Sequence, residues 1–569
     1  MGDAGSLAGE KVAPTLHYND WPNTLGFDTH YEERTPVELR VEGDIPAYAA
    51  GTLFRTGLGP RTIRTAKDAD FKVNHWFDNF SQVHRFQIHP PQPGAKARVT
   101  YNSRLTSDGL IEKIRKTGKL DGFTFAARYD PCKSFFQKMQ AVFQPAQPEP
   151  KPNEVNVGVT MSANFPGLSR DGHKTERPRD ARDGMTLCNK TDANMLQFLD
   201  PETLEPIGVA HQATLHPALT GVGSGAHAKS DPATGDVFNY NLDFGRTGTY
   251  RVWRASASTG KTSILATFHH APAYIHSLFL TENYVVLCVW NSYYKAGGAS
   301  ILWTRNLLDA MAWDGKRSTT WFIIDKKSPE EGGKGVIASY ESKALFSFHS
   351  INAYEEPSTS QQGAVDVICD LVAYENMDVL HHFYLDNIIS DLPQAHSARK
   401  SMPFTAVPNY RRYRLPGISS TPKTKHMQAM QDFEGSKANA FELPIINPMM
   451  VTKKHRYMYG ISDTGKSTFV DGLVKYDAET HTTLRWSVHG QSPGEPIFVA
   501  DPRSDDEDGG VLLSVVLDGP GGKSYLLVLD AKTMTEVGRA HVDGAIGFGF
   551  HGLHVSSRTP VGRQNGLHL

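Results

Sequence analysis

The sequence predicts an all-β protein, and among all-β folds it favours a β-propeller. Short segments such as 83–88 and 97–104 alternate apolar and polar side chains and are separated by glycine and proline turns. A turn of the form Asp-Pro/Ala-x-Thr recurs between β-rich flanks, at Asp200, Asp231, Asp477 and Asp530. An aspartate at this position accepts hydrogen bonds from amides two or three residues later and fixes a tight turn. Recurrence at irregular spacing indicates blades with long insertions, although the same turn occurs in sandwiches.

The composition is that of an ordinary globular protein. The chain has 569 residues, which exceeds the usual size of one compact core, but a propeller grows by adding blades. Hydrophobic residues make up 39% and charged residues 21%, and the formal net charge of −2 gives no electrostatic reason to expect a nucleic-acid partner. The chain has four cysteines: Cys132, Cys188, Cys288 and Cys369. They form no CxxC pair, which argues against a zinc knuckle and suits a protein in a reducing compartment.

The polar, proline-containing residues 1–40 predict an N-terminal arm, and 41–569 predict one propeller domain. Polar stretches at about 105–150, 162–187 and 395–437 are expected to be insertions on the surface. Apolar runs stay below the roughly 18 to 20 residues that span a bilayer, and the N-terminus does not resemble a secretion signal. We therefore expect a cytoplasmic location.

One segment carries a helical rather than a strand pattern. Phe135, Phe136, Met139 and Phe143 recur at helical spacing and place apolar side chains on one face. Such a helix could pack on the rim of the sheets. It could also lie at a membrane surface, where it would collect a lipid-like substrate and associate the protein peripherally with the membrane.

Four histidines stand at the edge of apolar or glycine-rich segments: His227, His276, His349 and His551. They are far apart in sequence, so they converge only if the chain closes on itself and brings its C-terminal segment to earlier ones. Four imidazoles at one point would hold a metal ion, and Zn, Cu, Fe and Ni all accept such ligands.

Two glutamates interrupt apolar strands, Glu442 in Ala-Phe-Glu-Leu-Pro and Glu495 in Gly-Glu-Pro-Ile-Phe. A buried carboxylate must be paired, and the free N–H of a metal-bound imidazole would pair it. The alternative is an exposed charge at a strand end.

Ordered motifs across most of the chain carry a family resemblance. They include Gly51-Thr-Leu-Phe-Arg55, His75-Trp-Phe-Asp78, His227-Ala-Lys-Ser-Asp-Pro232, Phe348-His349-Ser-Ile-Asn, Phe441-Glu442-Leu-Pro444, Glu495-Pro-Ile-Phe-Val499 and Phe548-Gly-Phe-His551-Gly552. The chain resembles the carotenoid cleavage oxygenases, and segments 75–88 and 155–166 resemble fungal, torulene-cleaving members.

The resemblance implies a seven-bladed β-propeller whose helical and loop insertions cap an iron centre. It implies that the four histidines bind Fe(2+) and that Glu442 and Glu495 support two of them. The third supporting glutamate of the family corresponds to Asp192, whose side chain is one methylene shorter. Whether Asp192 reaches its histidine directly or through a water stays open at this point.

The resemblance also implies a dioxygenase that cleaves a conjugated C=C bond of a polyene with O2 to give aldehyde or ketone products. A torulene-like or β-carotene-like carotenoid or apocarotenoid is the expected substrate, and the helix at 135–143 would flank the tunnel entrance. Stilbene-cleaving members carry a lysine directly before the supporting acid, where this chain has Thr191; Lys190 would face the opposite way by strand alternation. A stilbene dioxygenase, a non-oxidative isomerase or hydrolase, and a non-catalytic propeller that binds a partner are the alternatives.

Overall fold

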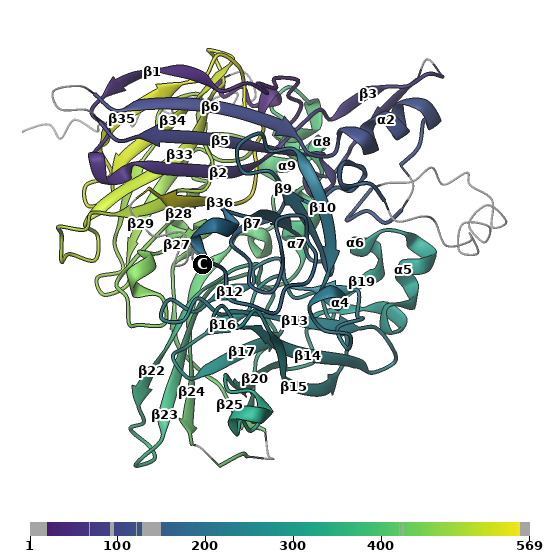
Figure 1. The fold of residues 1–569 in the computed structure, drawn as a ribbon, viewed down its shortest axis with the longest axis vertical. Helices are drawn as coiled ribbons and strands as arrows, with labels where there is room; N and C mark the ends of the chain where they lie inside the picture. The colour runs from purple at the N-terminus through teal and green to yellow at the C-terminus, as the bar shows by residue number, and fades with distance from the viewer. Residues whose placement is uncertain are drawn as a thin grey trace, which may run out of the picture.

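A computed structural model describes residues 20–67, 69–91, 96–120, 122–127, 150–419, 421–423 and 426–557. Across these ranges the chain is mostly β-sheet, and successive sheets follow one another around a common centre in a propeller-like arrangement (Figure 1). The predicted all-β, propeller-like architecture is confirmed. The helix predicted at Phe135, Phe136, Met139 and Phe143 lies outside the described residues.

Five sheets of four or five strands follow one another from residue 160 to residue 486. The first contains β7 (Thr160–Ala163), β8 (Leu187–Lys190), β9 (Met195–Leu199) and β10 (Pro206–His211). The second contains β11 (Gly223–Ser224), β12 (Lys229–Ser230), β13 (Val237–Asp243), β14 (Gly248–Ala255) and β15 (Thr262–His270). The third contains β16 (Phe279–Leu280), β17 (Tyr284–Val289), β20 (Thr319–Asp325), β21 (Val336–Ser342) and β25 (Met427–Gln428). The fourth contains β22 (Ser350–Pro357), β23 (Val365–Ala373), β24 (Asn409–Ile418) and β26 (Met430–Glu434). The fifth contains β27 (Glu442–Ile445), β28 (Tyr457–Ser462), β29 (Gly472–Asp477) and β30 (Thr483–Trp486).

The remaining large sheet joins the two ends of the chain. Its C-terminal strands are β31 (Gln491–Pro493), β32 (Ile497–Ala500), β33 (Gly510–Asp518), β34 (Lys523–Asp530), β35 (Glu536–His541) and β36 (Gly552–Ser556). Its N-terminal strands are β1 (Val37–Gly43), β2 (Gly51–Leu58), β5 (Ser81–His89) and β6 (Arg98–Leu105). β36 pairs antiparallel with β2, so Gly552 lies opposite Arg55. This pairing closes the ring and fixes the position of His551, the residue before β36.

Seven separate blades are not seen among the described residues, which form six sheets of four or more strands. The difference has one cause. β1 pairs with β6 on one side and with β35 on the other, and this merges two groups of strands into a single sheet of ten. β1 begins at Val37, so it also crosses the predicted boundary between the arm and the domain.

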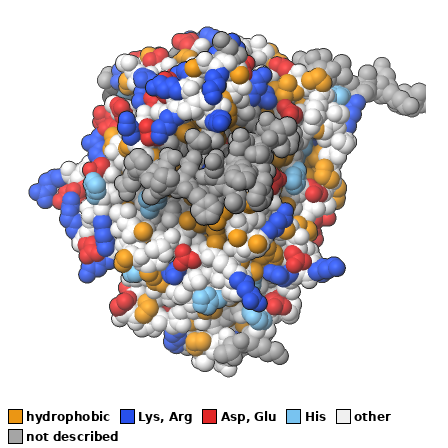
Figure 2. All heavy atoms as spheres, turned by 90° about the vertical axis from the view of Figure 1, so that its right-hand side faces the viewer, with side chains coloured by type: hydrophobic (Ala, Val, Ile, Leu, Met, Phe, Trp, Pro, Cys, Tyr) orange, Lys and Arg blue, Asp and Glu red, His pale blue; other side chains and the backbone are white. Residues whose placement is uncertain are grey.

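Short helices lie in the connections between strands and on one side of the ring. They are α2 (Asp108–Thr117), α4 (Gln212–Leu215), α5 (Ala299–Thr304), α6 (Leu307–Ala310), α7 (Asp378–His382), α8 (Leu385–Ile388) and α9 (Pro393–Lys400). Figure 2 looks at the face that carries α5 and shows hydrophobic side chains gathered there. Within the described ranges, none of the helices is long and apolar enough to cross a membrane.

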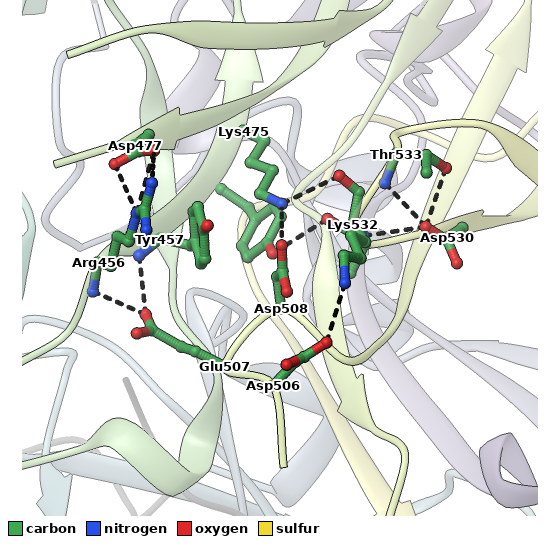
Figure 3. A network of polar contacts seen from close by, with 12 residues as sticks. Arg456, Tyr457, Lys475, Asp477, Asp506, Glu507, Asp508, Asp530, Lys532 and Thr533 are labelled. Atoms are coloured by element: carbon green, nitrogen blue, oxygen red, sulfur yellow. Dashed lines mark hydrogen bonds and ion pairs between the residues drawn. The ribbon is translucent and has the colours of Figure 1, made fainter. Parts of the chain in front are cut away.

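The recurring aspartate turns form as predicted. The Asp477 carboxylate accepts hydrogen bonds from the amides of Glu479 and Thr480 at 2.9 and 3.2 Å. The carboxylates of Asp200, Asp231 and Asp530 each accept bonds in the same way from the amides two and three residues later. Figure 3 shows the turns at Asp477 and Asp530 on either side of a buried ion pair between Lys475 and Asp508. These turns link neighbouring strands, and the ion pair ties the fifth sheet to the last one.

Part of the predicted surface insertion at 395–437 is instead sheet. β24 and β26 occupy 409–418 and 430–434 and belong to the fourth sheet. The arginines that suggested a solvated loop are paired across the strands, Arg411 with Glu434, Arg412 with Asp370 and Arg414 with Asp432. Tyr413 and Leu415 between them are buried.

Candidate metal centre

The four histidines stand where inner strands of four groups of strands begin. His227 lies between β11 and β12, His276 shortly before β16, His349 directly before β22 and His551 directly before β36. The His227 amide donates to the His276 carbonyl at 3.2 Å, so these inner segments lie side by side. The ring therefore aims four imidazoles at its centre from four directions.

The candidate ligand atoms of the four histidines all lie within 4.8 Å of one another, and all four side chains are buried. His227 Nε2 is 2.9 Å from His551 Nε2, and His349 Nε2 is 3.3 Å from His551 Nε2. Two nitrogens that each lie about 2.1 Å from one metal ion, at a right angle, are about 3.0 Å apart. The observed spacings match that arrangement.

Three carboxylates, those of the buried Glu495 and of the partly buried Asp192 and Glu442, hold three of the rings by their outer nitrogens. The Nδ1 contacts are Asp192 with His276 at 2.8 Å, Glu442 with His349 at 2.6 Å, and Glu495 with His551 at 2.7 Å. An Nδ1–H that donates to a carboxylate leaves the Nε2 lone pair directed at the centre. Lone pairs that face each other at about 3 Å repel unless a cation lies between them, so this donor set fits a metal ion.

The electrostatics keep the imidazoles of His227 and His551 neutral, as metal ligands must be. Burial, followed by the charges of the neighbouring histidines, holds the pKa values of His227 and His551 well below the ordinary value. Burial would raise the pKa of Glu442, but His349 and the Tyr374 hydroxyl outweigh it and lower that pKa. Burial raises the pKa of Glu495 to about 8 despite the nearby Arg55. A cation at the His551 ring would favour the charged carboxylate again.

The carboxylates have further partners that the sequence did not single out. Tyr274 donates to Asp192 Oδ2 at 2.9 Å, and Tyr374 donates to Glu442 Oε1 at 2.7 Å. Glu495 Oε2 instead accepts from the Gly552 amide at 2.7 Å and lies 3.7 Å from Arg55 Nη1. Tyr274 could have been found, because it lies two residues before His276 and so on the same side of an extended segment. Tyr374 gives no such signal.

A cavity of about 1160 Å³ opens beside the centre and is lined by His276, His349 and His551. Its walls near the histidines are mostly aromatic: Trp76, Phe77, Phe348, Phe383 and Phe550. Residues from α2, α5, α6, α7 and α9 complete the lining, so the inserted helices cover the centre. Phe123, Val222 and Leu302 line the cavity and are more than half exposed, which places an opening of the cavity at these apolar side chains.

The chain is similar to proteins of one family over nearly its whole length. The RPE65 family model, described as retinal pigment epithelial membrane protein, matches residues 26–556. The chain belongs to the RPE65, or carotenoid cleavage oxygenase, family. It is 41% identical to a carotenoid dioxygenase of Neurospora crassa, over 97% of this chain and 94% of that protein. It is 38% identical to a torulene dioxygenase of Fusarium fujikuroi, over 95% of this chain and 94% of that protein.

Solved structures show the same fold. A variant of Synechocystis apocarotenoid oxygenase superposes with a TM-score of 0.69 at 18% identity, covering 95% of this chain and 99% of that one. A cobalt-substituted form of the Synechocystis enzyme also matches, with the same TM-score of 0.69. The predicted family and the predicted dioxygenase class of this carotenoid cleavage oxygenase are confirmed.

Proposed function

We propose that this protein is an Fe(2+)-dependent dioxygenase that cleaves a conjugated C=C bond of a carotenoid or apocarotenoid. One observation carries the proposal. Four buried imidazoles face a single point on the wall of a large apolar cavity, and three carboxylates orient three of them. Its relatives are named as dioxygenases of carotenoids, which agrees with a polyene lying in that cavity.

His227, His276, His349 and His551 would hold the ferrous ion. Because imidazoles carry no charge, they leave the charge of the ion uncompensated and its remaining positions open. The bound ion would supply the activation of O2. One C=C bond is broken, and each of its carbons gains one oxygen atom, so two carbonyl products account for the whole of O2.

The side chains that line the cavity would orient the substrate and exclude water from it. Aromatic rings of Phe77, Phe348 and Phe383 pack against one another, with centroids 5.5 to 6.4 Å apart, and offer flat faces to a polyene. Such rings exclude water and favour conjugated ligands. We assign no protein acid or base, because the overall reaction transfers no proton.

We infer that the architecture corresponds to seven blades in one domain, which begins with β1 at Val37 and not at residue 41 as predicted. Four groups of strands carry the histidines, while Asp192, Glu442 and Glu495 come from the first sheet, the fifth sheet and the β31–β35 group. On this interpretation each blade contributes one residue to the centre, and β1 joins two blades at the closure of the ring.

The stilbene alternative has less support. Thr191 lines the cavity, whereas Lys190 is buried and is absent from the described lining. A phenol beside the metal centre would therefore meet a hydroxyl and not an ammonium group.

We also infer that the cavity opens toward a membrane surface from a cytoplasmic protein. Phe123, Val222, Leu302 and Trp303 are exposed on or beside the cavity opening. Clustered exposed apolar side chains typically mark a contact with a membrane or a partner.

The test is product analysis. The purified protein, reconstituted with Fe(2+), is incubated in air with a carotene, an apocarotenoid and resveratrol, and products are identified by chromatography and mass spectrometry. We expect loss of the polyene band, uptake of one O2 per polyene, and one atom of heavy oxygen in each carbonyl product. Cleavage of resveratrol alone would support the stilbene alternative. Iron-loaded protein that cleaves none of these compounds would contradict the proposal.

A further inference from the structure

One end of the cavity is polar, although the walls around the metal centre are aromatic. Polar side chains that line this end include Arg399 on α9, His382 at the end of α7, and Asp463 directly after β28. Arg399 Nη2 donates to Asp463 Oδ1 at 2.6 Å, and Arg399 Nη1 lies 3.1 Å from the sulfur of Met402. We call this group of Arg399, His382 and Asp463 the polar end.

The polar end lies on the Glu442 side of the centre. Glu442 is opposite Ile461 in the β27–β28 pairing, and Asp463 follows two residues later, about 7 Å further along the strand. On the cavity wall, the Phe348 ring lies 5.9 Å from the His276 ring and 6.4 Å from the Phe383 ring. Phe383 is next to His382, so a continuous aromatic wall leads from the centre to the polar end.

The apolar opening lies on the other side, near Asp192. Val222 lines that opening, and its carbonyl accepts from the Asn194 amide at 3.1 Å, two residues beyond Asp192. A long ligand that passes the metal centre would therefore have one end near Val222 and the other near Arg399. The opening is bordered by apolar side chains and the exposed Arg246, whereas the polar end holds Arg399, His382 and Asp463.

The polar end is rich in hydrogen-bond donors. A guanidinium carries five N–H donors, and the contacts described above direct one to a carboxylate and one to a thioether, which is a weak acceptor. Burial, followed by the charge of Arg399, lowers the pKa of His382 to about 4. The imidazole is therefore neutral at physiological pH and offers one N–H. The acceptors in the group are the Asp463 carboxylate, which is already paired with Arg399, and the second ring nitrogen of His382.

We propose that the polar end binds the terminal carbonyl oxygen of the substrate, so that this enzyme acts on apocarotenoids that end in an aldehyde or a carboxylate. A carbonyl oxygen only accepts hydrogen bonds and so matches donors of Arg399 and His382, whereas a methyl end group would leave those donors unmatched. The hydrocarbon end would lie at the apolar opening. This inference rests on the proposed polyene cleavage at the metal centre, and it names the substrate class of that site.

The experiment compares three polyenes with the same ring and chain length that end in a methyl, an aldehyde or a carboxylate group. The iron-loaded enzyme is assayed for kcat/KM and for the masses of its products. The same three compounds are titrated under nitrogen, with tryptophan fluorescence reporting binding without turnover. A hydrogen bond to a charged group predicts a preference of roughly 10- to 100-fold for the oxygen-bearing ends, in both binding and kcat/KM.

Substitution of Arg399 should remove this preference. We expect R399M to reduce the ratio of kcat/KM for the aldehyde to kcat/KM for the methyl compound to about threefold or less. R399K should retain part of the preference, because lysine keeps the charge but lacks the planar guanidinium. Lys400→Met is the matched control on the same helix, because Lys400 is exposed and absent from the described lining, and it should keep the wild-type ratio. Thermal melts and iron content verify each variant.

Equal binding and equal kcat/KM for the three end groups in the wild type would overturn the inference, as would an unchanged preference in R399M. If R399M fails to fold, the end-group preferences of the wild type and of R399K still test the inference. Preferential binding under nitrogen without cleavage in air would support the polar end and contradict the cleavage function instead. The two proposals can therefore fail separately.

Discussion

Asp192 lies in direct contact with the metal centre, because its Oδ1 is 2.8 Å from His276 Nδ1. The shorter side chain therefore needs no bridging water. Tyr274 strengthens the arrangement, since its hydroxyl donates to Asp192 Oδ2 at 2.9 Å and lies 3.1 Å from His276 Nδ1. The hydrogen bond from Tyr274 thus holds the Asp192 carboxylate in contact with the His276 ring.

Replacing Asp192 by asparagine should weaken metal binding. The amide removes the negative charge that makes the His276 imidazole a stronger ligand for the metal. Loss of such a partner typically costs 10- to 100-fold in metal affinity or activity. Competition for Fe(2+) or Co(2+) against a coloured chelator measures the affinity. D200N, on the same sheet but in an exposed turn, is the control and should bind as the wild type does. Affinity of D192N within twofold of the wild type would show that Asp192 does not support the metal.

The sequence drew attention to the four histidines, because each lies at the edge of an apolar or glycine-rich segment. Asp192 was placed only by the family resemblance. Arg55 and Glu495 illustrate the limit. They are 440 residues apart, and their contact depends on the pairing of β36 with β2, which no local pattern encodes.

The fold shows the same division between local and long-range information. The aspartate turns depend on amides two and three residues away, and all four formed as predicted. The sequence predicts a surface insertion at 395–437 because this stretch is polar, yet Arg411, Arg412 and Arg414 lie in a strand at 409–418. Their acidic partners lie 18 to 42 residues away, beyond the reach of a local pattern.

The buried pair Lys475–Asp508 should matter far more than its exposed neighbour Lys532–Asp506. Figure 3 shows both pairs. The side chains of the first pair are 6% and 8% exposed, and those of the second are 61% and 62% exposed. D508N leaves a buried ammonium without its carboxylate, so we expect a loss of about 3 to 5 kcal/mol in the free energy of unfolding. D506N should cost less than about 1 kcal/mol. Chemical denaturation measures both, and equal losses would refute this view of the inter-sheet contact.

Lys190 should make stability depend on pH. Its buried Nζ has no hydrogen-bond partner among the described residues, and burial lowers its pKa to about 8. Between about pH 8 and 10.5 the unfolded chain then binds more protons than the folded one, so this residue makes stability rise with pH across that window. Below pH 8 both states carry the proton, and the full penalty of burying the charge remains.

K190M should remove that penalty. We expect the free energy of unfolding of the variant to exceed that of the wild type by up to about 3 kcal/mol at pH 7. This difference should shrink toward pH 10.5. Urea unfolding at a series of pH values tests this, because groups common to both proteins cancel in the difference. Lys116, whose side chain is 72% exposed, supplies the control K116M, which should show a flat difference. A K190M difference that is flat or grows with pH would contradict the assigned protonation.

The claim that four imidazoles hold one iron ion is tested most directly by a crystal structure of the iron-loaded protein, with anomalous data on both sides of the iron absorption edge. The account predicts one peak, present only above the edge, at about 2.1 Å from the Nε2 atoms of His227, His276, His349 and His551. Iron bound elsewhere, or any of these four rings turned away from the peak, would contradict it.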